Sequence, residues 1–323
     1  MLLSKIFKKK PKVLIVGDVM LDTFILGTYL GKSPEGPIPM IKKDKEYSTG
    51  GGAALVAQCV NKIGASPFLI GGVGNDNNGK KLKLYIKQKN IKKFFIDNKN
   101  SITTNKVRFF SNFKSLLRLD NETIFKIDKK QNIKLKKKII DKIKSSDIVV
   151  VSDYGKGFCT STILNLIISH TNKLNIPLIV DTKKNARNFN IYKNSYCIKP
   201  NFLEAKSIYK SLKRSDVSLK NCSLFIKKKY RIKNIIITLG EDGSTLLDEK
   251  NNFYHFRHIK KKNIDVTGAG DNFISSLAVS MALLKDLKIA SNISNNLSGL
   301  AVEKFGTYAV TLKNLISEIK KLK

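Results

Sequence analysis

D-V-T-G-A-G-D, residues 265–271, is the most specific stretch of this sequence, and apolar residues follow it at the spacing of an amphipathic helix. Its glycines, Gly268 and Gly270, let a backbone approach an anion closely. A helix that begins here directs unpaired N–H groups and the positive end of its dipole at the same point. The stretch therefore predicts a glycine turn that opens a helix and binds an anion.

Asp271 lies in the first turn of that helix, beside the predicted anion site. A carboxylate at this position can accept a proton from a hydroxyl that attacks a neighbouring phosphorus. The alternative is an ordinary helix start with an acidic capping residue. Under the first interpretation Asp271 is the candidate general base.

Upstream of this stretch, short Val/Ile/Leu runs alternate with helical patterns. This rhythm is typical of parallel strands joined by helices that cover both faces of a sheet, so we expect an α/β fold. The expected strands are residues 12–17, 68–72, 148–152, 177–181, 196–199 and 235–239. The expected helices are residues 53–63, 133–143, 161–170 and 202–212.

Two stretches do not follow the alternation. Residues 23–47 carry three prolines, and residues 103–119 carry two short apolar groups, so both are typical of β hairpins that stand off the main sheet. We expect them to form a small β lid. No internal repeat or linker divides the chain, which predicts one domain over residues 12–319 after a basic N-terminal tail, residues 1–11.

The formal net charge of +35 could indicate a protein that binds nucleic acid or an anionic membrane. Only six of the 60 basic residues are arginine, however, and arginine is the side chain that groove and phosphate readers favour. A lysine excess spread along the whole chain is typical of a solvated surface. We therefore expect no nucleic-acid partner.

The sequence also argues against a membrane protein and against a fold stabilised by zinc ions or disulfides. No apolar run approaches the roughly 18 residues of a membrane-spanning helix, and the N-terminus has no apolar region of signal-peptide length. The cysteines lie far apart, with three histidines in the chain, which argues against disulfides and zinc sites. We expect a cytoplasmic protein with no membrane partner.

Several motifs together resemble the ribokinase-like (PfkB) sugar kinase family. D-V-T-G-A-G-D and G-G-G-A-A, residues 50–54, resemble its two signatures. Its D-glycero-D-manno-heptose 7-phosphate kinase branch is similar in G-D-V-M-L-D (17–22), S-P-E-G-P-I-P (33–39), S-D-Y-G-K-G (152–157), K-P-N-F-L-E (199–204) and K-F-G-T (304–307). The resemblance implies a three-layer α/β/α sandwich with a mostly parallel central sheet and a small β lid.

The resemblance also implies an activity and its cofactors, ATP and Mg²⁺. The family branch transfers the γ-phosphoryl group of ATP to the anomeric hydroxyl of heptose 7-phosphate, and the 1,7-bisphosphate product serves lipopolysaccharide core (ADP-heptose) synthesis. By this resemblance Asp271 is the catalytic base. The backbone of Gly268, Ala269 and Gly270 would neutralise charge on the transferring group, in agreement with the electrostatics of a helix start.

The N-x-x-E motif of the family matches Asn201 and Glu204, which implies that they hold magnesium and its waters near the nucleotide phosphates. Oxygen donors acting through water suit magnesium, because this ion gives up its water reluctantly. The same spacing fits a helix N-cap with a capping-box glutamate. Both interpretations stay open at this stage.

Further residues match the positions where the family binds the nucleotide. The resemblance implies that Thr238, Gly240 and Gly243 line the nucleotide pocket and that Asn295 and Gly306 close over the adenine and ribose. A simple hairpin turn would also explain Gly240 and Gly243. Core packing would explain much of the helix around Asn295.

The sugar site is expected at the carboxyl ends of the strands, where α/β sheets bind ligands. The candidates for contact with the sugar are Asp22, Asp18, Gly51, Gly52, Asp153 and Asp181. A phosphorylated sugar also needs a cationic clamp. Its candidates are Arg108, Arg118, Lys156 and Lys183.

One position departs from the heptose branch, which usually has asparagine where this chain has Leu55. A leucine side chain forms no hydrogen bond. Either Gln58, one helical turn later, replaces that asparagine, or the preferred sugar differs. Another PfkB kinase, acting on a pentose, a hexose phosphate or a nucleoside, therefore remains an alternative.

Two alternatives lie outside the enzymes, namely a catalytically idle sugar-nucleotide sensor and a basic nucleic-acid binder. Intact Asp271, Asn201 and Glu204 argue against the first of them. Apolar lid residues such as Ile38 and Met40 would meet either the sugar site or a second subunit. We accordingly expect a homodimer that forms through the lid.

Overall fold

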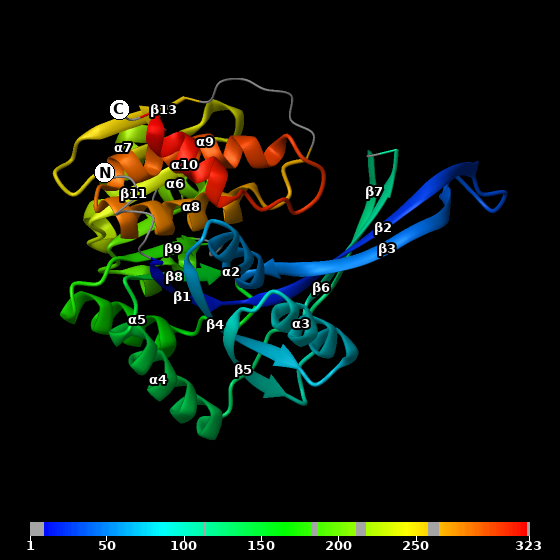
Figure 1. Cartoon of the computed structure of the whole chain (residues 1–323), viewed down its shortest axis with the longest axis horizontal. Coiled ribbons are helices and arrows are strands. Elements are labelled where there is room, and N and C mark those ends of the chain that lie inside the picture. Colours follow the sequence, from blue (N-terminus) through cyan, green and yellow to red (C-terminus); the bar gives the residue numbers. More distant parts are fainter. Residues whose placement is uncertain (1–9, 113, 183–185, 211–217, 258–264, 322–323) are drawn as a thin grey trace.

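The computed structural model describes residues 10–112, 114–182, 186–210, 218–257 and 265–321. A nine-stranded sheet forms its centre, in the order β13-β12-β11-β10-β9-β8-β1-β4-β5 (Figure 1). Neighbouring strands are parallel, except that β12 is antiparallel to both of its neighbours, β11 and β13. The strands are β1 (Lys12–Gly17), β4 (Ser66–Gly74), β5 (Lys92–Asn98), β8 (Ile148–Asp153), β9 (Leu178–Thr182), β10 (Cys197–Lys199), β11 (Asn234–Thr238), β12 (Ser244–Leu247) and β13 (Phe253–Phe256).

Side-chain alternation along the central strands divides the core into two layers. In β1, Val13 and Ile15 belong to one buried cluster, whereas Leu14 and Val16 belong to the other. The first cluster contains the apolar faces of α2 (Ala53–Lys62), α3 (Asn77–Gln88), α8 (Ala269–Leu284), α9 (Leu287–Val302) and α10 (Leu312–Lys320). The second contains those of α4 (Lys129–Lys144), α5 (Ser161–Lys173), α6 (Phe202–Lys210) and α7 (Leu219–Tyr230). The predicted three-layer sandwich is confirmed.

A second sheet of four strands, in the order β3-β2-β6-β7, projects from this body (Figure 1). Its strands are β2 (Val19–Lys32), β3 (Pro39–Gly52), β6 (Asn105–Ser111) and β7 (Lys114–Asn121). We call this sheet the lid. The pairing of β2 with β3 shifts register after Leu26 and again after Tyr29.

The lid is more closely joined to the body than the sequence predicts. We expected it to begin at residue 23, but β2 begins at Val19, so that Asp18 alone separates it from the end of β1 at Gly17. Its other strand, β3, runs on to Gly52, directly before α2. The root of the lid is therefore buried and continuous with the central sheet, while its far half is exposed.

The six predicted strands and four predicted helices all exist, with ends shifted by a few residues, except that residues 211 and 212 lie outside the described part of the chain. The sequence analysis gave no bounds for the helix around Asn295, which is α9, and it did not predict β5, β12, β13, α3, α7 or α10. Among the described helices, none has the length and apolar character to cross a membrane.

Candidate active site

The central strands end side by side at the edge from which the lid rises. Gly17 of β1 pairs with Ser152 of β8, Ser152 with Asp181 of β9, and Asp181 with Lys199 of β10. These four residues form one row across the sheet. Parallel α/β sheets bind ligands at this edge, and a cavity of about 250 Å³ lies close to it.

The cavity lies between the root of the lid and the start of α8. The groups around it are mostly polar or cationic. Its described lining consists of Met20, Asp22, Gly52, Leu55, Lys106, Arg108, Arg118, Tyr154, Thr267, Gly268 and Asp271.

The start of α8 forms one wall of this cavity. Gly268 is the N-cap residue of α8, and its φ of +80° is a left-handed conformation that favours glycine. No described side chain forms a capping hydrogen bond at this end of the helix. A Cβ added at Gly268 would lie 3.0 Å from Leu55 Cδ2. Gly268 thus presents its backbone to the cavity at an uncapped helix start, as an anion site requires, whereas the Ala269 N–H donates to the Val266 carbonyl oxygen at 3.2 Å.

Asp271 projects from the first turn of α8 and is 7% exposed. The hydroxyl of Tyr154, from the loop after β8, donates a hydrogen bond of 2.9 Å to its Oδ1. Burial and the Asp271 carboxylate raise the pKa of Tyr154 well above its usual value, so this phenol stays protonated. The predicted general base therefore lies at the cavity with a neutral hydrogen-bond donor beside it.

A buried ion pair lies behind the glycine turn. Lys199 Nζ is 2.9 Å from Asp181 Oδ1, and both side chains are 3% exposed. A Cβ added at Gly270 would lie 3.9 Å from the same Nζ. Lys199 thus brings a positive charge to the start of α8, and the buried carboxylate of Asp181 is its partner.

The root of the lid supplies an acid and three cations. Asp22 of β2 is buried and pairs with Arg108 of β6 at 2.5 Å. Arg108 lies opposite Arg118 of β7, and Lys106 lies opposite Asp22. Burial lowers the pKa of Lys106, although Asp120 and Asp22 act against this change. The predicted phosphate clamp residues Arg108 and Arg118 are therefore together at the cavity.

The glycines before α2 give these groups room. A Cβ at Gly51 would lie 2.3 Å from Asp22 Oδ2, and one at Gly52 would lie 2.5 Å from the backbone oxygen of Asp18. Gly52 also has φ +55°. Only glycine permits this approach of the chain to Asp22.

Asp18 is not in the lining of the cavity. Its Oδ2 accepts the backbone N–H groups of Tyr154 and Lys156, at 2.8 and 3.1 Å, and its Oδ1 accepts that of Phe158, at 3.1 Å. Burial and the neighbouring Asp153 raise its pKa to about 6. Asp18 therefore holds the loop after β8.

Two further predicted residues in this region also point elsewhere. Asp153 accepts hydrogen bonds from the Gly155 N–H, at 2.8 Å, and from the Tyr192 hydroxyl, at 2.7 Å. Lys156 pairs with Glu122 at the rim of the lid. Neither lines the cavity, and Lys183 lies outside the described residues.

Asn201 and Glu204 form a reciprocal cap at the start of α6. Glu204 Oε2 accepts the N–H of Asn201 at 2.8 Å, and Asn201 Oδ1 accepts the N–H of Glu204 at 2.9 Å. Asn201 also bridges to Thr238 at the end of β11. The capping-box interpretation is thus realised, and the pair lies two residues beyond Lys199.

The nucleotide-side candidates occupy turns and the core. Gly240 and Gly243 have φ +65° and +88° around a short 3-10 turn. Asn295 is buried and accepts a hydrogen bond from Ser244 at 3.1 Å. Gly306 donates its N–H to Asp265 Oδ2 at 3.0 Å, while Asp265 Oδ1 accepts the Thr267 N–H at 2.9 Å. Asp265 thus ties the Gly306 turn to the glycine turn of α8.

The model of the pfkB family carbohydrate kinases matches residues 10–314. The chain belongs to this family. It is accordingly a phosphotransferase whose acceptor is a hydroxyl group.

The similar sequences are of one kind. The chain is 31% identical over 306 residues to the bifunctional protein HldE of a Nitratiruptor species, covering 95% of this chain and 64% of that protein. It is 34% identical over 310 residues to the bifunctional protein HldE of Bradyrhizobium diazoefficiens, covering 95% and 62%. The chain thus spans less than two thirds of the length of these relatives.

Solved structures share the fold of this pfkB kinase. Phosphofructokinase-2 from Escherichia coli in complex with potassium matches with a TM-score of 0.78 and 16% identity, over 97% of this chain and 99% of that one. Ribokinase from Arabidopsis thaliana, complexed with ribose and ATP, matches with a TM-score of 0.74 and 17% identity, over 97% and 99%. The ribokinase-like fold expected from the sequence is confirmed.

The family implies a magnesium ion, and the side chains of Asn201 and Glu204 in this pfkB kinase are suited to contact it through water. Both offer oxygen donors, which magnesium prefers. Their hydrogen bonds to each other's backbone already use one oxygen of each side chain. Contact through the waters of the ion fits this arrangement, because it leaves the cap in place.

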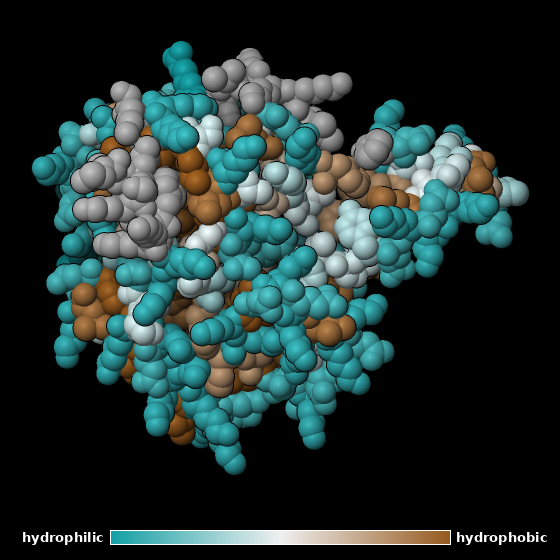
Figure 2. Space-filling view, in the orientation of Figure 1, coloured by the Kyte–Doolittle hydropathy of each residue, from teal (hydrophilic) through white to brown (hydrophobic). Residues whose placement is uncertain are grey.

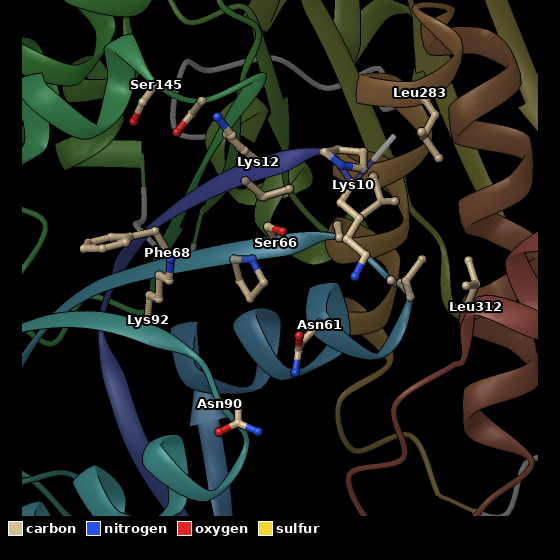
Figure 3. Close-up of a pocket in the computed structure, with 18 of the residues that line it drawn as sticks. Lys10, Lys12, Asn61, Ser66, Phe68, Asn90, Lys92, Ser145, Leu283 and Leu312 are labelled. Carbon is tan, nitrogen blue, oxygen red and sulfur yellow. The ribbon is translucent and has the colours of Figure 1, made fainter. Parts of the chain in front are cut away.

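A larger cavity, of about 660 Å³, lies at the opposite edge of the sheet (Figure 3). It lies at the starts of β1 and β4, where Lys10, Lys12, Ser66 and Lys92 surround it. None of its described lining residues is Asp, Glu, His or Cys, so it offers no general base. Size alone does not identify the catalytic cavity of this pfkB kinase.

Leu55, which occupies the position where the heptose branch usually has asparagine, is 1% exposed and lines the cavity beside Asp271, next to Gly268. Gln58 does not line it, and its side chain accepts a hydrogen bond from the Tyr85 hydroxyl instead. Of the two explanations for the missing asparagine, replacement by Gln58 is therefore disfavoured.

Sequence reasoning assigned no role to Tyr154, Lys199 or Lys106. Tyr154 and Lys199 lie in the family-like segments S-D-Y-G-K-G and K-P-N-F-L-E, immediately beyond or at the end of a buried strand. Their position at a carboxyl strand end was the available signal. Lys106 carried no such signal, since it is one lysine among many on an exposed-looking hairpin.

Proposed function

We propose that this pfkB kinase phosphorylates the anomeric hydroxyl of D-glycero-D-manno-heptose 7-phosphate with ATP, giving the 1,7-bisphosphate for ADP-heptose and lipopolysaccharide core synthesis. The observation that carries the proposal is the composition of the cavity, which Asp271 lines together with three cationic side chains from the root of the lid. A substrate that already bears a phosphate needs such a clamp. The HldE relatives and the heptose-branch motifs support the same substrate class.

In this proposal Asp271 removes the proton of the acceptor hydroxyl as the oxygen attacks the γ-phosphorus. The backbone of residues 268–270, at the uncapped start of α8, would stabilise the charge on the transferring group. Lys199, paired with Asp181 behind the turn, adds a buried positive charge at the same place. Phosphoryl transfer needs mainly positioning and such electrostatic stabilisation.

The sugar phosphate would lie across the root of the lid. Arg108 and Arg118 would hold its phosphate, because guanidinium groups bind phosphate oxygens in pairs. Asp22, oriented by Arg108 and by the space at Gly51, would accept hydrogen bonds from sugar hydroxyls. Asp18, Asp153 and Lys156 would act on the loop around the site, in line with their hydrogen bonds and ion pair.

ATP would approach from the other side of the glycine turn. Thr238, Gly240, Gly243, Asn295 and Gly306 would surround the nucleotide. Asn201 and Glu204 would hold magnesium through its waters, and the ion would supply charge neutralisation for the nucleotide phosphates. The link from Asp265 to the Gly306 turn would keep the nucleotide side in register with the catalytic turn.

We further propose that the protein acts in the cytoplasm as a homodimer formed through the lid. Apolar side chains lie exposed on the lid among hydrophilic ones (Figure 2). They are Tyr29, Leu30, Ile38, Met40, Leu116, Leu117 and Leu119. A second lid would cover them, and the paired lids would help to exclude water from the site. Sedimentation of the purified chain, compared with an Ile38→Lys, Leu117→Lys variant, tests this point: dimers are expected only without the substitutions.

The activity is tested with purified protein, magnesium ATP and a panel of sugar phosphates, with ADP release as the readout. Heptose 7-phosphate is expected to give the highest kcat/KM, and the product to carry its new phosphate on C1. Preference for another sugar would replace the proposed substrate and favour the second candidate, a pfkB kinase for a different sugar, which Leu55 makes the natural competitor. Asp271→Asn is the inactive control in each case.

A further inference from the structure

Tyr154 connects the loop after β8 to Asp271. Its hydroxyl donates to Asp271 Oδ1 at 2.9 Å, and its own N–H donates to Asp18 Oδ2 at 2.8 Å. The loop and α8 are 117 residues apart in the chain. The Tyr154 side chain therefore fixes the distance between two separate elements at the cavity.

The loop that carries Tyr154 is held at both ends. Asp18 accepts three of its backbone N–H groups, and Asp153 accepts a fourth, from Gly155. Asp18, Asp153 and Cys159 bring potential ligand atoms within 4.8 Å of one another. All four carboxylate oxygens already accept hydrogen bonds from the protein, so this buried cluster acts as a loop anchor and does not suit a metal ion.

The ring of Tyr154 is held as well. A Cβ at Gly52 would lie 3.5 Å from its Cδ2, so the bare backbone of Gly52 lies against the ring. The ammonium group of Lys106 lies 5.6 Å from the ring centroid, in the range of a cation–π contact. These contacts involve the ring alone, and a phenylalanine would keep them.

We propose that Tyr154 is a positioning residue for phosphoryl transfer, which holds the Asp271 carboxylate in its ionised and correctly oriented form. This inference rests on the proposed function of the site. Tyr154 keeps its own proton throughout. The acceptor proton moves to Asp271, the new O–P bond forms at the γ-phosphorus, and the bond to the ADP oxygen breaks.

A hydrogen bond to the charged form of a carboxylate favours that form. Other titratable groups also face the Tyr154–Asp271 pair, namely Cys59 from α2, Asp22 from β2, Lys106 from β6 and Asp181 from β9. All of them remain in a Tyr154→Phe variant. A change in the pH profile of that variant therefore reports the missing hydroxyl.

The experiment compares Tyr154→Phe with Tyr192→Phe in the full chain. Tyr192 donates to Asp153 on the other side of the same loop, so this control also loses a buried tyrosine hydroxyl. Tyr154→Phe is expected to lower kcat about 10-fold, with KM for both substrates within about 2-fold. The acid limb of its kcat profile should move up by about half a pH unit or more. Tyr192→Phe should leave that limb in place.

Two kinetic outcomes overturn the proposal. One is a Tyr154→Phe kcat within about 2-fold of wild type on an unshifted profile. The other is an equal loss in both variants without a shift of the acid limb, which would mean only a looser loop.

A spectroscopic measurement separates this inference from the proposed function. In protein labelled with ¹³C at tyrosine Cζ, the signal that vanishes in Tyr154→Phe belongs to Tyr154. That signal should move in Asp271→Asn, whichever sugar the enzyme uses. If wild type phosphorylates no sugar in the panel but the signal moves, the proposed function fails and the Tyr154 contact stands. An unmoved signal overturns the contact itself.

Discussion

The helices α6 and α8 begin at the same edge of the central sheet, but their first turns differ in how they are capped. Asn201 and Glu204 close the first turn of α6 with reciprocal side-chain hydrogen bonds. At α8, Gly268 takes a left-handed conformation, no described side chain caps the turn, and Asp271 lines the cavity. A capped turn has satisfied its amides within the protein, whereas an open turn keeps them for a ligand.

This difference in capping explains why two similar sequence patterns at helix starts indicate different roles. Both starts place a carboxylate in the first helical turn. At α6 that carboxylate completes a structural motif, so any ligand role must be added through water. At α8 the carboxylate and the backbone of Gly268 line one cavity, and Lys199 lies behind the turn, near Gly270. Under the proposed function, the start of α8 is therefore expected to take part in the chemistry, and the start of α6 to support it.

The largest effect is expected from Asp271→Asn, which removes the base but keeps the shape of the side chain. Turnover should fall at least about 10²-fold, while the fold and ATP affinity are retained. Steady-state kinetics and calorimetric titration with ATP measure the two quantities. Near-normal turnover would remove α8 from the chemistry and erase the distinction between the two helix starts.

A smaller effect is expected from Gly268→Ala, which forces a left-handed alanine and brings Cβ within 3.0 Å of Leu55 Cδ2. The backbone strain costs about 1–2 kcal/mol, and displacement of the amides should lower kcat about 10-fold. Gly64→Ala is the matched control, because Gly64 has φ +92° and its Cβ would lie 3.2 Å from Leu312. That variant should lose stability but keep kcat, and equal losses of kcat would refute a specific role of the turn.

Glu204→Gln tests α6, because glutamine can complete a capping box but carries no charge. The free energy of unfolding should stay within about 0.5 kcal/mol of wild type. At limiting magnesium, kcat should fall about 5-fold and recover as the concentration of the ion is raised. A magnesium titration that superimposes on wild type would leave Glu204 with the cap alone. Gln131→Ala, in the remote capping box of α4, should change stability without changing that titration.

The smallest effect is expected from Leu55→Asn, beside the open turn of α8. An amide here can contact the sugar, so the ratio of kcat/KM between heptose 7-phosphate and another sugar phosphate should change about 3-fold or more. The KM for ATP should stay constant, and a melting curve should verify that this buried substitution leaves the chain folded. An unchanged ratio would mean that residue 55 does not touch the sugar.

The sequence predicted the central strands well because they are buried on both faces and consist of continuous apolar runs. It missed β5 and α3, whose sequences K-K-F-F-I-D-N and N-N-G-K-K-L-K-L-Y-I-K-Q dilute the apolar face with lysine. It also missed the edge hairpin β12–β13, which has only four residues in each strand. A strand of four residues is too short for an alternating or continuous apolar pattern to stand out from its surroundings.

The position of Asp271 at the start of α8 follows from local sequence alone, and the structure has it there. The contacts around it do not. Tyr154 reaches Asp271 from 117 residues away, and Lys199 meets Asp181 only because β9 and β10 are in register. Asp18 illustrates the same limit, since its role depends on a loop that follows a different strand. Such partners are set by topology, which single-sequence patterns do not encode.

The two register shifts between β2 and β3 have an evolutionary consequence. Side chains alternate along a strand, so a slip of one residue would turn Asp22 away from its partner Arg108. The irregularities after Leu26 and Tyr29 lie between this pair and the hairpin tip at residues 33–38. Insertions or deletions at the tip can be accommodated at these irregularities, while the inner half of β2 keeps its register with β3 and β6. The tip is thus the segment whose length can change with little disturbance of the Asp22–Arg108 pair.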